Sequence, residues 1–165
     1  MTKAIRYQPL SSIPLSFYIE LHGNPQVLRH LPLAPGGFDE LACQRWLAAK
    51  EQLWVSAGYA PQAVIVDGEF AGWAGLQPEL GEAALAIVLT PKHWGIGLAV
   101  ARQLLDRAFT ALKLSSVCVL LPPSRTRVGA LQRFGFELLG DVDYDGSVFK
   151  HYRLARQRYF QLNNS

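Results

Sequence analysis

The stretch that decides the fold is residues 83–112, which read AALAIVLTPKHWGIGLAVARQLLDRAFTAL. Its apolar run, Ala83 to Leu89, stops at Thr90-Pro91 and is typical of a buried strand. A short loop containing Gly95 and Gly97 follows. Apolar residues then recur every three or four positions, which predicts an amphipathic helix; they are Leu98, Ala101, Leu105, Ala108, Phe109 and Leu112. The stretch therefore predicts a strand, a glycine loop and a helix in succession.

The loop between this strand and this helix has the features of an anion site. The first amides of a helix have no partner within the helix, and the helix dipole places partial positive charge beside them. We expect Gly95 and Gly97 to let the backbone turn tightly and to let a ligand approach without a Cβ in its way. A phosphate or pyrophosphate fits such a site, although an ordinary strand-to-helix turn would explain the loop taken alone.

The spacing of the loop excludes two other classes of phosphate-binding protein. A dinucleotide fingerprint needs a third small residue, where this chain has Val100, and an acidic residue further on. The segment 112–121 contains no Asp or Glu, which argues against a nicotinamide-dependent oxidoreductase. A P-loop would need Gly-Lys followed by Ser or Thr, and the loop lacks it.

Composition predicts one domain over residues 1–165, ending in a polar tail from about residue 155 that we expect to fray. No apolar run reaches the roughly 18 residues of a membrane span, and the first residues lack the apolar centre of a signal peptide. Cys43 and Cys118 stand far apart and form no metal or disulfide motif, so a reduced, cytoplasmic protein fits best. A net charge of +3 suits an anionic cofactor but is too mild to indicate nucleic acid.

The rest of the chain predicts further strands and helices around this unit. Strands are expected at 5–10, 60–66, 69–76, 82–89, 116–121, 134–140 and 148–154. Helices are expected from Ser11 or Ser12 to about 21, and at 25–31, 39–56 and 126–133. Asp67-Gly68 and Asp145-Gly146 read as hairpin turns. The class is therefore α/β (α+β), with strands 60–89 forming an antiparallel meander.

Several motifs together resemble the GNAT superfamily of N-acetyltransferases. Trp94-Gly95-x-Gly97-x-Ala99 is similar to its motif A, Q/R-x-x-G-x-G/A, and the Trp looks most like the branch of ribosomal-protein alanine N-acetyltransferases. The segment Leu131 to Glu137 is similar to the end of its motif B, and Gly72 to Leu76 to the branch's G-x-x-G-L strand. The order of elements is also that of the superfamily. Ser124 and Arg127 depart from the N-x-x-S that often begins the motif B helix.

The resemblance implies a GNAT fold, with a mixed, mostly antiparallel central sheet, splayed strands and helices on both faces. It implies transfer of acetyl from acetyl-CoA to a primary amine by direct attack in a ternary complex, without a metal. The amine would belong to a protein N-terminus, a lysine or a small metabolite, and the protein would be a monomer or a homodimer with no nucleic-acid or membrane partner. A non-catalytic acyl-CoA sensor of the same fold is the alternative.

The resemblance also implies where the cofactor binds. Backbone groups of Ile87, Val88 and Leu89 would bind the pantetheine arm as an added strand binds a sheet edge. The pyrophosphate would lie on Trp94, Gly95, Ile96, Gly97, Leu98 and Ala99. Lys92 or His93 would add positive charge near the phosphates, a solvated loop being the alternative. Ser124 would hydrogen-bond the pantetheine or cap the following helix.

Catalytic and acceptor residues are less clearly marked in the sequence. Glu82 begins the cofactor strand, near a position where many relatives carry an acidic general base, while Glu79 and Glu69 are weaker candidates near turns. The general-acid Tyr that many relatives have in motif B is missing, since Leu131 and Gln132 stand there. Tyr144 in the last hairpin is the replacement we predict, with His151 and Tyr152 as neighbours. The segment from Arg29 to Phe38, with Arg29 and His30 as its donors, is predicted to bind the acceptor together with the 142–152 hairpin.

Overall fold

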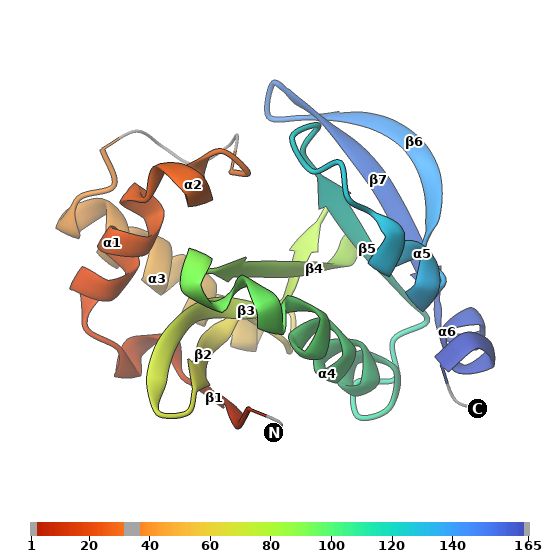
Figure 1. Cartoon of the computed structure of the whole chain (residues 1–165), viewed down its shortest axis with the longest axis horizontal. Coiled ribbons are helices and arrows are strands. Elements are labelled where there is room, and N and C mark those ends of the chain that lie inside the picture. Colours follow the sequence, from red (N-terminus) through yellow and green to blue (C-terminus); the bar gives the residue numbers. More distant parts are fainter. Residues whose placement is uncertain (1–2, 32–36, 164–165) are drawn as a thin grey trace.

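The computed structural model describes residues 3–31 and 37–163, which form a seven-stranded sheet in the order β1-β2-β3-β4-β5-β7-β6 (Figure 1). The strands are β1 Ile5–Gln8, β2 Gln62–Val66, β3 Glu69–Glu79, β4 Glu82–Leu89, β5 Ser116–Leu121, β6 Glu137–Tyr144 and β7 Ser147–Ala155. Neighbouring strands are antiparallel except β4 and β5, which are parallel. The predicted α/β class with a mixed, mostly antiparallel sheet is confirmed.

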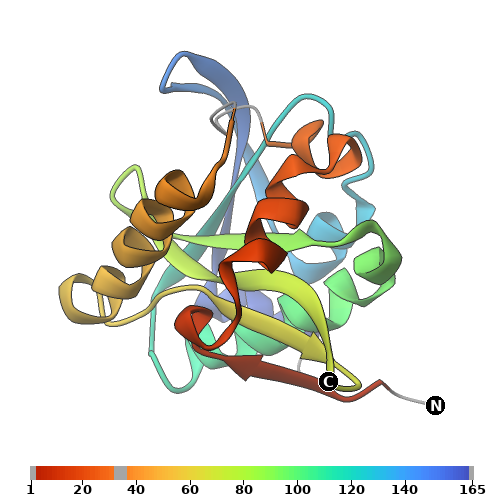
Figure 2. The same ribbon diagram turned by 90° about the vertical axis from the view of Figure 1, so that its left-hand side faces the viewer.

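Helices cover both faces of this sheet (Figures 1 and 2). They are α1 Leu15–Gly23, α2 Pro25–Leu28, α3 Glu40–Ser56, α4 Gly97–Phe109, α5 Gly129–Phe134 and α6 Arg156–Asn163, with short 3-10 helices η1 Leu10–Ser12 and η2 Pro91–Ile96. Figure 2 shows α1 and α3 side by side on one face, and α4 lies on the other face. Within residues 3–31 and 37–163, no helix is both long and apolar enough to cross a membrane.

Strand β4 separates two packing layers because its side chains alternate between the faces. Ala86 and Val88 pack with the cluster of α1 and α3, whereas Ile87 and Leu89 pack with the cluster under α4. Helix α4 is amphipathic, as predicted. Its buried stripe, however, includes Val100 and Leu104, which were not predicted to be buried, and excludes Leu98, which is 48% exposed. The strand and helix at the centre of the sequence therefore divide the molecule into an α1/α3 side and an α4 side.

Several predicted boundaries are wrong. Strand β1 ends at Gln8 rather than residue 10, α5 begins at Gly129 rather than 126, and β6 begins at Glu137 rather than 134.

Two further differences concern the first helix and the tail. Neither Ser11 nor Ser12 caps the first helix: they lie in η1, and α1 begins only after Pro14. The polar tail does not fray over its described part, because residues 156–163 form α6. Tyr159 explains this difference because it is 1% exposed. Its ring packs against that of Phe109, with centroids 5.3 Å apart, and its hydroxyl donates to the Asp106 carboxylate of α4. One buried aromatic residue thus anchors a segment whose composition is otherwise polar.

Candidate active site

The sheet opens between β4 and β5, and the opening forms the main cleft of the molecule. The two parallel strands share a single registered pair, Ala84 with Cys118, while β3 pairs with β4 along its whole length. Beyond that pair the strands diverge (Figure 1) and leave a cavity of about 650 Å³. Side chains of α1, α3 and α4 and of the loop after β5 line it. The cleft therefore runs from the N-terminus of α4 through the sheet to the α1/α3 side.

The N-terminus of α4 stands at one mouth of the cleft. Within the described part of the chain, no side chain caps this helix. The Gly97 amide already donates to the Trp94 backbone oxygen of η2, so a ligand at this helix end would use the amides that follow Gly97. Gly97 lies at φ −54°, in right-handed helical geometry, and Gly95 is not at positive φ either, so the expectation that they permit a tight turn is wrong. A Cβ at Gly97 would meet only the Leu89 Cδ1 at 3.9 Å, and one at Gly95 would meet nothing within 4 Å. What these glycines supply is open space beside the helix end.

The structure brings some of the predicted cofactor residues to the cleft and leaves others elsewhere. Those that line it are Ile87, Val88, Leu89, Trp94, Gly97 and Leu98. Gly95, Ile96 and Ala99 do not line it; Ile96 is buried in the core beneath α4. His93 is also buried, and its Nδ1 is hydrogen-bonded to the Thr90 Oγ1 at 2.7 Å, which ties the loop together. Lys92 forms an exposed ion pair with Glu69 at 2.9 Å.

Trp94 closes the end of the β4 edge. Its indole Nε1 donates to the backbone oxygen of Leu89 at 2.8 Å, so this carbonyl is already paired. The Leu89 carbonyl thus already accepts one hydrogen bond. The Thr90 amide donates to the Ala71 carbonyl, and this register turns the backbone groups of Ala86 toward β3 and those of Ile87 toward the free edge. The ring of Trp94 lies edge-on to His30, with centroids 6.4 Å apart.

His30 and Ser124 join the two walls of the cleft. The His30 Nδ1 and the Ser124 Oγ are 2.8 Å apart, although the residues were predicted to serve the acceptor and the cofactor separately. Ser124 does not cap α5, which begins five residues later at Gly129 after Val128. The pKa of His30 is lowered by burial and by the charges of Arg125 and Arg29. Arg29 itself is exposed and does not line the cleft.

Four polar side chains meet on the α1/α3 side of the cleft, and we call them the inner polar cluster: Lys50, Gln77, Glu79 and Tyr144. The Lys50 Nζ donates to the Gln77 Oε1, and the Gln77 Nε2 donates to the Glu79 Oε1 at 3.0 Å. The neighbouring Glu79 carboxylate, with burial adding to it, raises the pKa of Tyr144 to about 12. Within the described residues, the Glu79 Oε2 is buried without a hydrogen-bond partner.

Sequence reasoning missed Lys50 and Gln77 and ranked Glu79 below Glu82, although signals were present. In β3 the buried Trp73 shares a face with Gln77 and Glu79, since side chains two apart point the same way. In α3 Lys50 follows Trp46 by four positions and so lies on the same apolar stripe. The sequence alone could therefore have indicated these residues, because each is a polar residue at a position that continues an apolar stripe.

An aromatic wall, made of His22, Phe38, Trp46 and Trp73, lines the cleft beside this cluster. The rings of His22 and Phe38 stack at 4.5 Å, and those of Trp46 and Trp73 meet edge to face at 5.5 Å. The Trp73 Nε1 donates to the His22 Nε2 at 3.0 Å. Both tryptophans pack with the core of the α1/α3 side and also line the cleft.

Burial of His22 makes stability depend on pH. Burial, with the charge of Lys50 adding to it, lowers the pKa of His22 from 6.5 to about 4. Between these values the unfolded chain binds a proton that the folded chain does not, so we expect the free energy of unfolding to fall by roughly 3 kcal/mol as the pH drops from about 6.5 to 4. Denaturant titrations across this range would measure the fall. In His22→Gln, which keeps an acceptor for Trp73, the slope should flatten; an unchanged slope would contradict the assignment.

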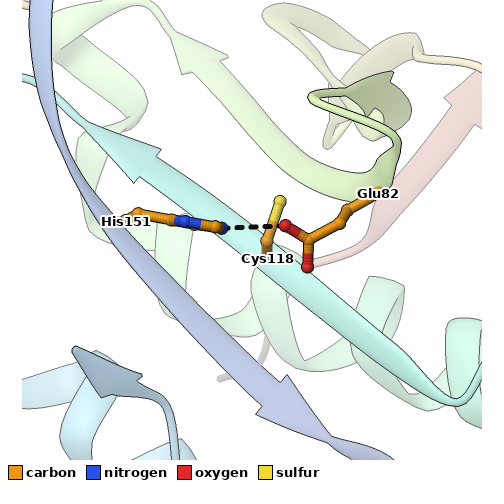
Figure 3. Close-up of side chains that lie close together, drawn as sticks. All are labelled: Glu82, Cys118 and His151. Carbon is orange, nitrogen blue, oxygen red and sulfur yellow. Dashed lines mark hydrogen bonds and ion pairs between the residues drawn. The ribbon is translucent and has the colours of Figure 1, made fainter. Parts of the chain in front are cut away.

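Glu82 is the cross-strand partner of Glu79 and lies on the same face of the sheet, but it does not line the cleft. It belongs to an ion-pair cluster with β7 (Figure 3). Its Oε1 accepts from the Arg153 Nε at 2.7 Å and its Oε2 is 2.9 Å from the His151 Nε2. The hydrogen bond from Arg153 is the main reason why the pKa of Glu82 is lowered, with His151 contributing. Both oxygens are thus occupied, and a carboxylate held in this way is a weak proton acceptor, so the surroundings do not support Glu82 as the general base.

Ligand atoms of Glu82, Cys118 and His151 lie within 4.8 Å of one another, close enough for a shared metal ion. Figure 3 shows them converging from β4, β5 and β7. Burial and the charge of Glu82 raise the pKa of the Cys118 thiol to about 12, so metal binding would have to displace the thiol proton. An ion would also have to displace Arg153 from Glu82. The donor set fits a metal poorly, and we treat it as an ion-pair cluster that joins β4 to β7.

Comparison with known proteins identifies the family. Residues 12–137, about three quarters of the chain, match the family model described as the acetyltransferase (GNAT) domain. The chain therefore belongs to the GNAT acetyltransferase family, as its motifs predicted. No curated protein matches the chain significantly. The likeness to the ribosomal-protein alanine branch stays a prediction.

Solved structures share the fold at low sequence identity. An acetyltransferase from Agrobacterium tumefaciens str. C58 is 20% identical, with a TM-score of 0.74 over 93% of this chain and 94% of that one. The spermidine N-acetyltransferase of Vibrio cholerae, solved with CoA and spermine, is 16% identical, with a TM-score of 0.71 over 96% and 98%. An aminoglycoside acetyltransferase solved with coenzyme A is 16% identical, with a TM-score of 0.73 over 99% and 100%.

Proposed function

We propose that this chain is a single-domain N-acetyltransferase that transfers the acetyl group of acetyl-CoA to a primary amine. The observation that carries the proposal is the cleft through the splayed sheet, with the uncapped α4 N-terminus at one end and the inner polar cluster at the other. Such a passage lets a donor and an acceptor enter from opposite sides and meet between β4 and β5. The structural neighbours that contain CoA support the choice of donor.

On the α4 side, the pyrophosphate would bind the first amides of α4 over the open space at Gly97. The pantetheine arm would follow the edge of β4 near Ile87, whose backbone groups point away from β3 on the side from which β5 has diverged. Arg125 and Arg127, which also line the cleft, would add positive charge toward the phosphates. The acetyl group would then reach the point where the strands separate, at Ala84.

On the other side, Glu79 would receive the acceptor amine. Its free Oε2 can accept a proton from the amine, and the neutral nitrogen can then attack the acetyl carbonyl carbon. A new C–N bond forms, the C–S bond breaks, and the departing thiolate needs a proton. The nitrogen must lose its extra proton to become an amide, and that proton restores the group that protonates the thiolate. Tyr144 remains protonated at neutral pH because its pKa is about 12, so it can supply that proton. Tyr144 thus keeps its predicted catalytic role, while the base moves from Glu82 to Glu79.

Thiol release from acetyl-CoA in the presence of an amine panel tests the proposal. We expect release to depend on both enzyme and amine, and mass spectrometry of the amine should show the added acetyl group. Binding of CoA without amine-dependent release across the panel would instead support the acyl-CoA sensor. Failure to bind acetyl-CoA at all would reject the donor assignment.

A further inference from the structure

The acceptor end of the cleft already holds one positive and one negative side chain, which meet at the apex of the splay. Gln77 is paired across the sheet with Ala84, and Ala84 is the residue of β4 that still pairs with β5. Lys50 reaches the same point from α3, and Glu79 lies two residues along β3. An acceptor bound at this point of the cleft would lie beside both charges.

Lys50 brings a half-buried ammonium group that, among the residues the structure describes, has one side-chain hydrogen-bond partner. One of its three N–H donors goes to the Gln77 Oε1, and the group also lies 5.3 Å from the centre of the Trp73 ring. Burial lowers the pKa of Lys50, and the nearby Glu79 carboxylate opposes that shift. A half-buried ammonium with further N–H donors favours an anionic ligand.

Glu79 presents the complementary need. One carboxylate oxygen accepts from Gln77, while the other is buried and, among the described residues, has no hydrogen-bond partner. A buried acceptor without a donor is costly, so a ligand that brings an N–H group gains from filling it. Lys50 therefore favours an anionic group of a ligand and Glu79 a cationic one, and the side-chain amide of Gln77 lies between them.

The amide of Gln77 indicates how far apart the two charged groups of such a ligand should be. Its oxygen accepts from Lys50 while its nitrogen donates to Glu79, so an acceptor atom and a donor atom a short distance apart connect the two charges. In an α-amino acid the carboxylate and the ammonium group have the same spacing to within one bond. A ligand of this kind would present its carboxylate to Lys50 and its ammonium to Glu79.

We infer that the acceptor is a small zwitterion, an amino acid or a close analogue, whose carboxylate pairs with Lys50 and whose ammonium pairs with Glu79. The inference rests on the proposed function and adds the class of the acceptor. The aromatic wall of His22, Phe38, Trp46 and Trp73 faces the same space, so an apolar or aromatic side chain suits it best. Lys50 therefore sets specificity, and Glu79 binds the amine before taking its proton.

The charges around the cleft disfavour polyamines. Besides Lys50, the cationic residues of the lining are Arg125 and Arg127, and Glu79 is the carboxylate among the lining residues that the structure describes. A second ammonium would meet Lys50 where a zwitterion places its carboxylate, and like charges at short range in a partly dry site repel. Although two of the structural neighbours are named for spermidine and aminoglycosides, this chain should prefer a ligand with one amine and one carboxylate.

The test compares matched acceptors that differ in the carboxylate alone. Phenylalanine and phenethylamine, leucine and isoamylamine, and spermidine as a polyamine would be assayed for acetyl transfer at saturating acetyl-CoA. We expect kcat/KM for each amino acid to exceed that of its decarboxylated partner by about 10-fold or more, because a charged hydrogen-bonding pair is at stake. Lys50→Met, which keeps an unbranched chain against Trp73, should erase that ratio. Lys3→Met, an exposed lysine far from the cleft, should keep it.

The outcomes separate this inference from the proposed function. Equal rates for the matched pairs, or a ratio that survives Lys50→Met, would overturn the zwitterion assignment while the acetyltransferase stands. Absence of transfer to any amine would instead count against the proposed function. Calorimetric binding of phenylalanine and phenethylamine to the CoA-saturated protein then decides the inference independently of turnover: tighter phenylalanine binding that Lys50→Met abolishes supports it, and any other result overturns it.

Discussion

Gly97→Glu should abolish measurable binding of CoA, raising its Kd by about 100-fold or more. The new carboxylate would stand beside the first amides of α4, in the space that the glycine leaves open. It would compete with the pyrophosphate for those donors, and its charge would repel it. Calorimetric titration with CoA and with acetyl-CoA measures the change directly.

The same substitution should leave the free protein folded, which makes the result interpretable. Gly97 has helical geometry and an open Cβ position, and an acidic residue in the first turn is favourable to a helix. Gly97→Ala, which adds one methyl group, should bind CoA more weakly than the wild type but more tightly than Gly97→Glu. Gly23→Glu makes the same change at an exposed position with nothing within 4 Å of its Cβ, and it should bind normally. Undiminished CoA affinity in folded Gly97→Glu would reject the pyrophosphate site.

The unit from β4 to α4 could be predicted from the sequence because its signals are local. A run of apolar residues, a proline and a helical repeat each act over a few positions. The start of α3 at Asp39 is a local signal of the same kind: the Asp39 Oδ1 accepts a hydrogen bond from the Ala42 amide at 2.8 Å. The reason for Gly95 and Gly97 could not be predicted in full. Whether a glycine serves a positive φ or an open space depends on the neighbouring elements, and only the structure distinguishes the two.

The site could be predicted only in part because its chemistry depends on pairings between distant segments. Glu82 seemed available as a base at the start of β4, but the register of β5 with β7 places Arg153 and His151 against both of its oxygens. Glu79 seemed to be a solvated turn residue, yet Tyr144 of the last hairpin and Gln77 enclose it. Neither arrangement follows from the spacing of residues along the chain.

Glu79→Gln should lower kcat by roughly 10²–10⁴-fold, the range expected when a general base is lost. The amide keeps the size of the side chain and an oxygen for the Gln77 donor, but it cannot take a proton from the acceptor amine. Affinity for CoA should stay near the wild-type value, because Glu79 lies at the acceptor end of the cleft. Single-turnover measurements across pH would show whether the loss lies in the chemical step.

Glu82→Gln is the matched comparison, since it makes the same change on the neighbouring strand and Glu79 is paired with Glu82 across the sheet. If Glu79 is the base, Glu82→Gln should cost stability, because Arg153 and His151 lose a charged partner, while kcat measured on the folded protein stays within a few-fold of the wild type. The opposite pattern, with a large loss of kcat in Glu82→Gln and little in Glu79→Gln, would return the role of base to Glu82. Measuring thermal stability beside kcat in both variants keeps the two effects apart, because an ion pair that joins β4 to β7 acts on Tm and a proton acceptor acts on the chemical step.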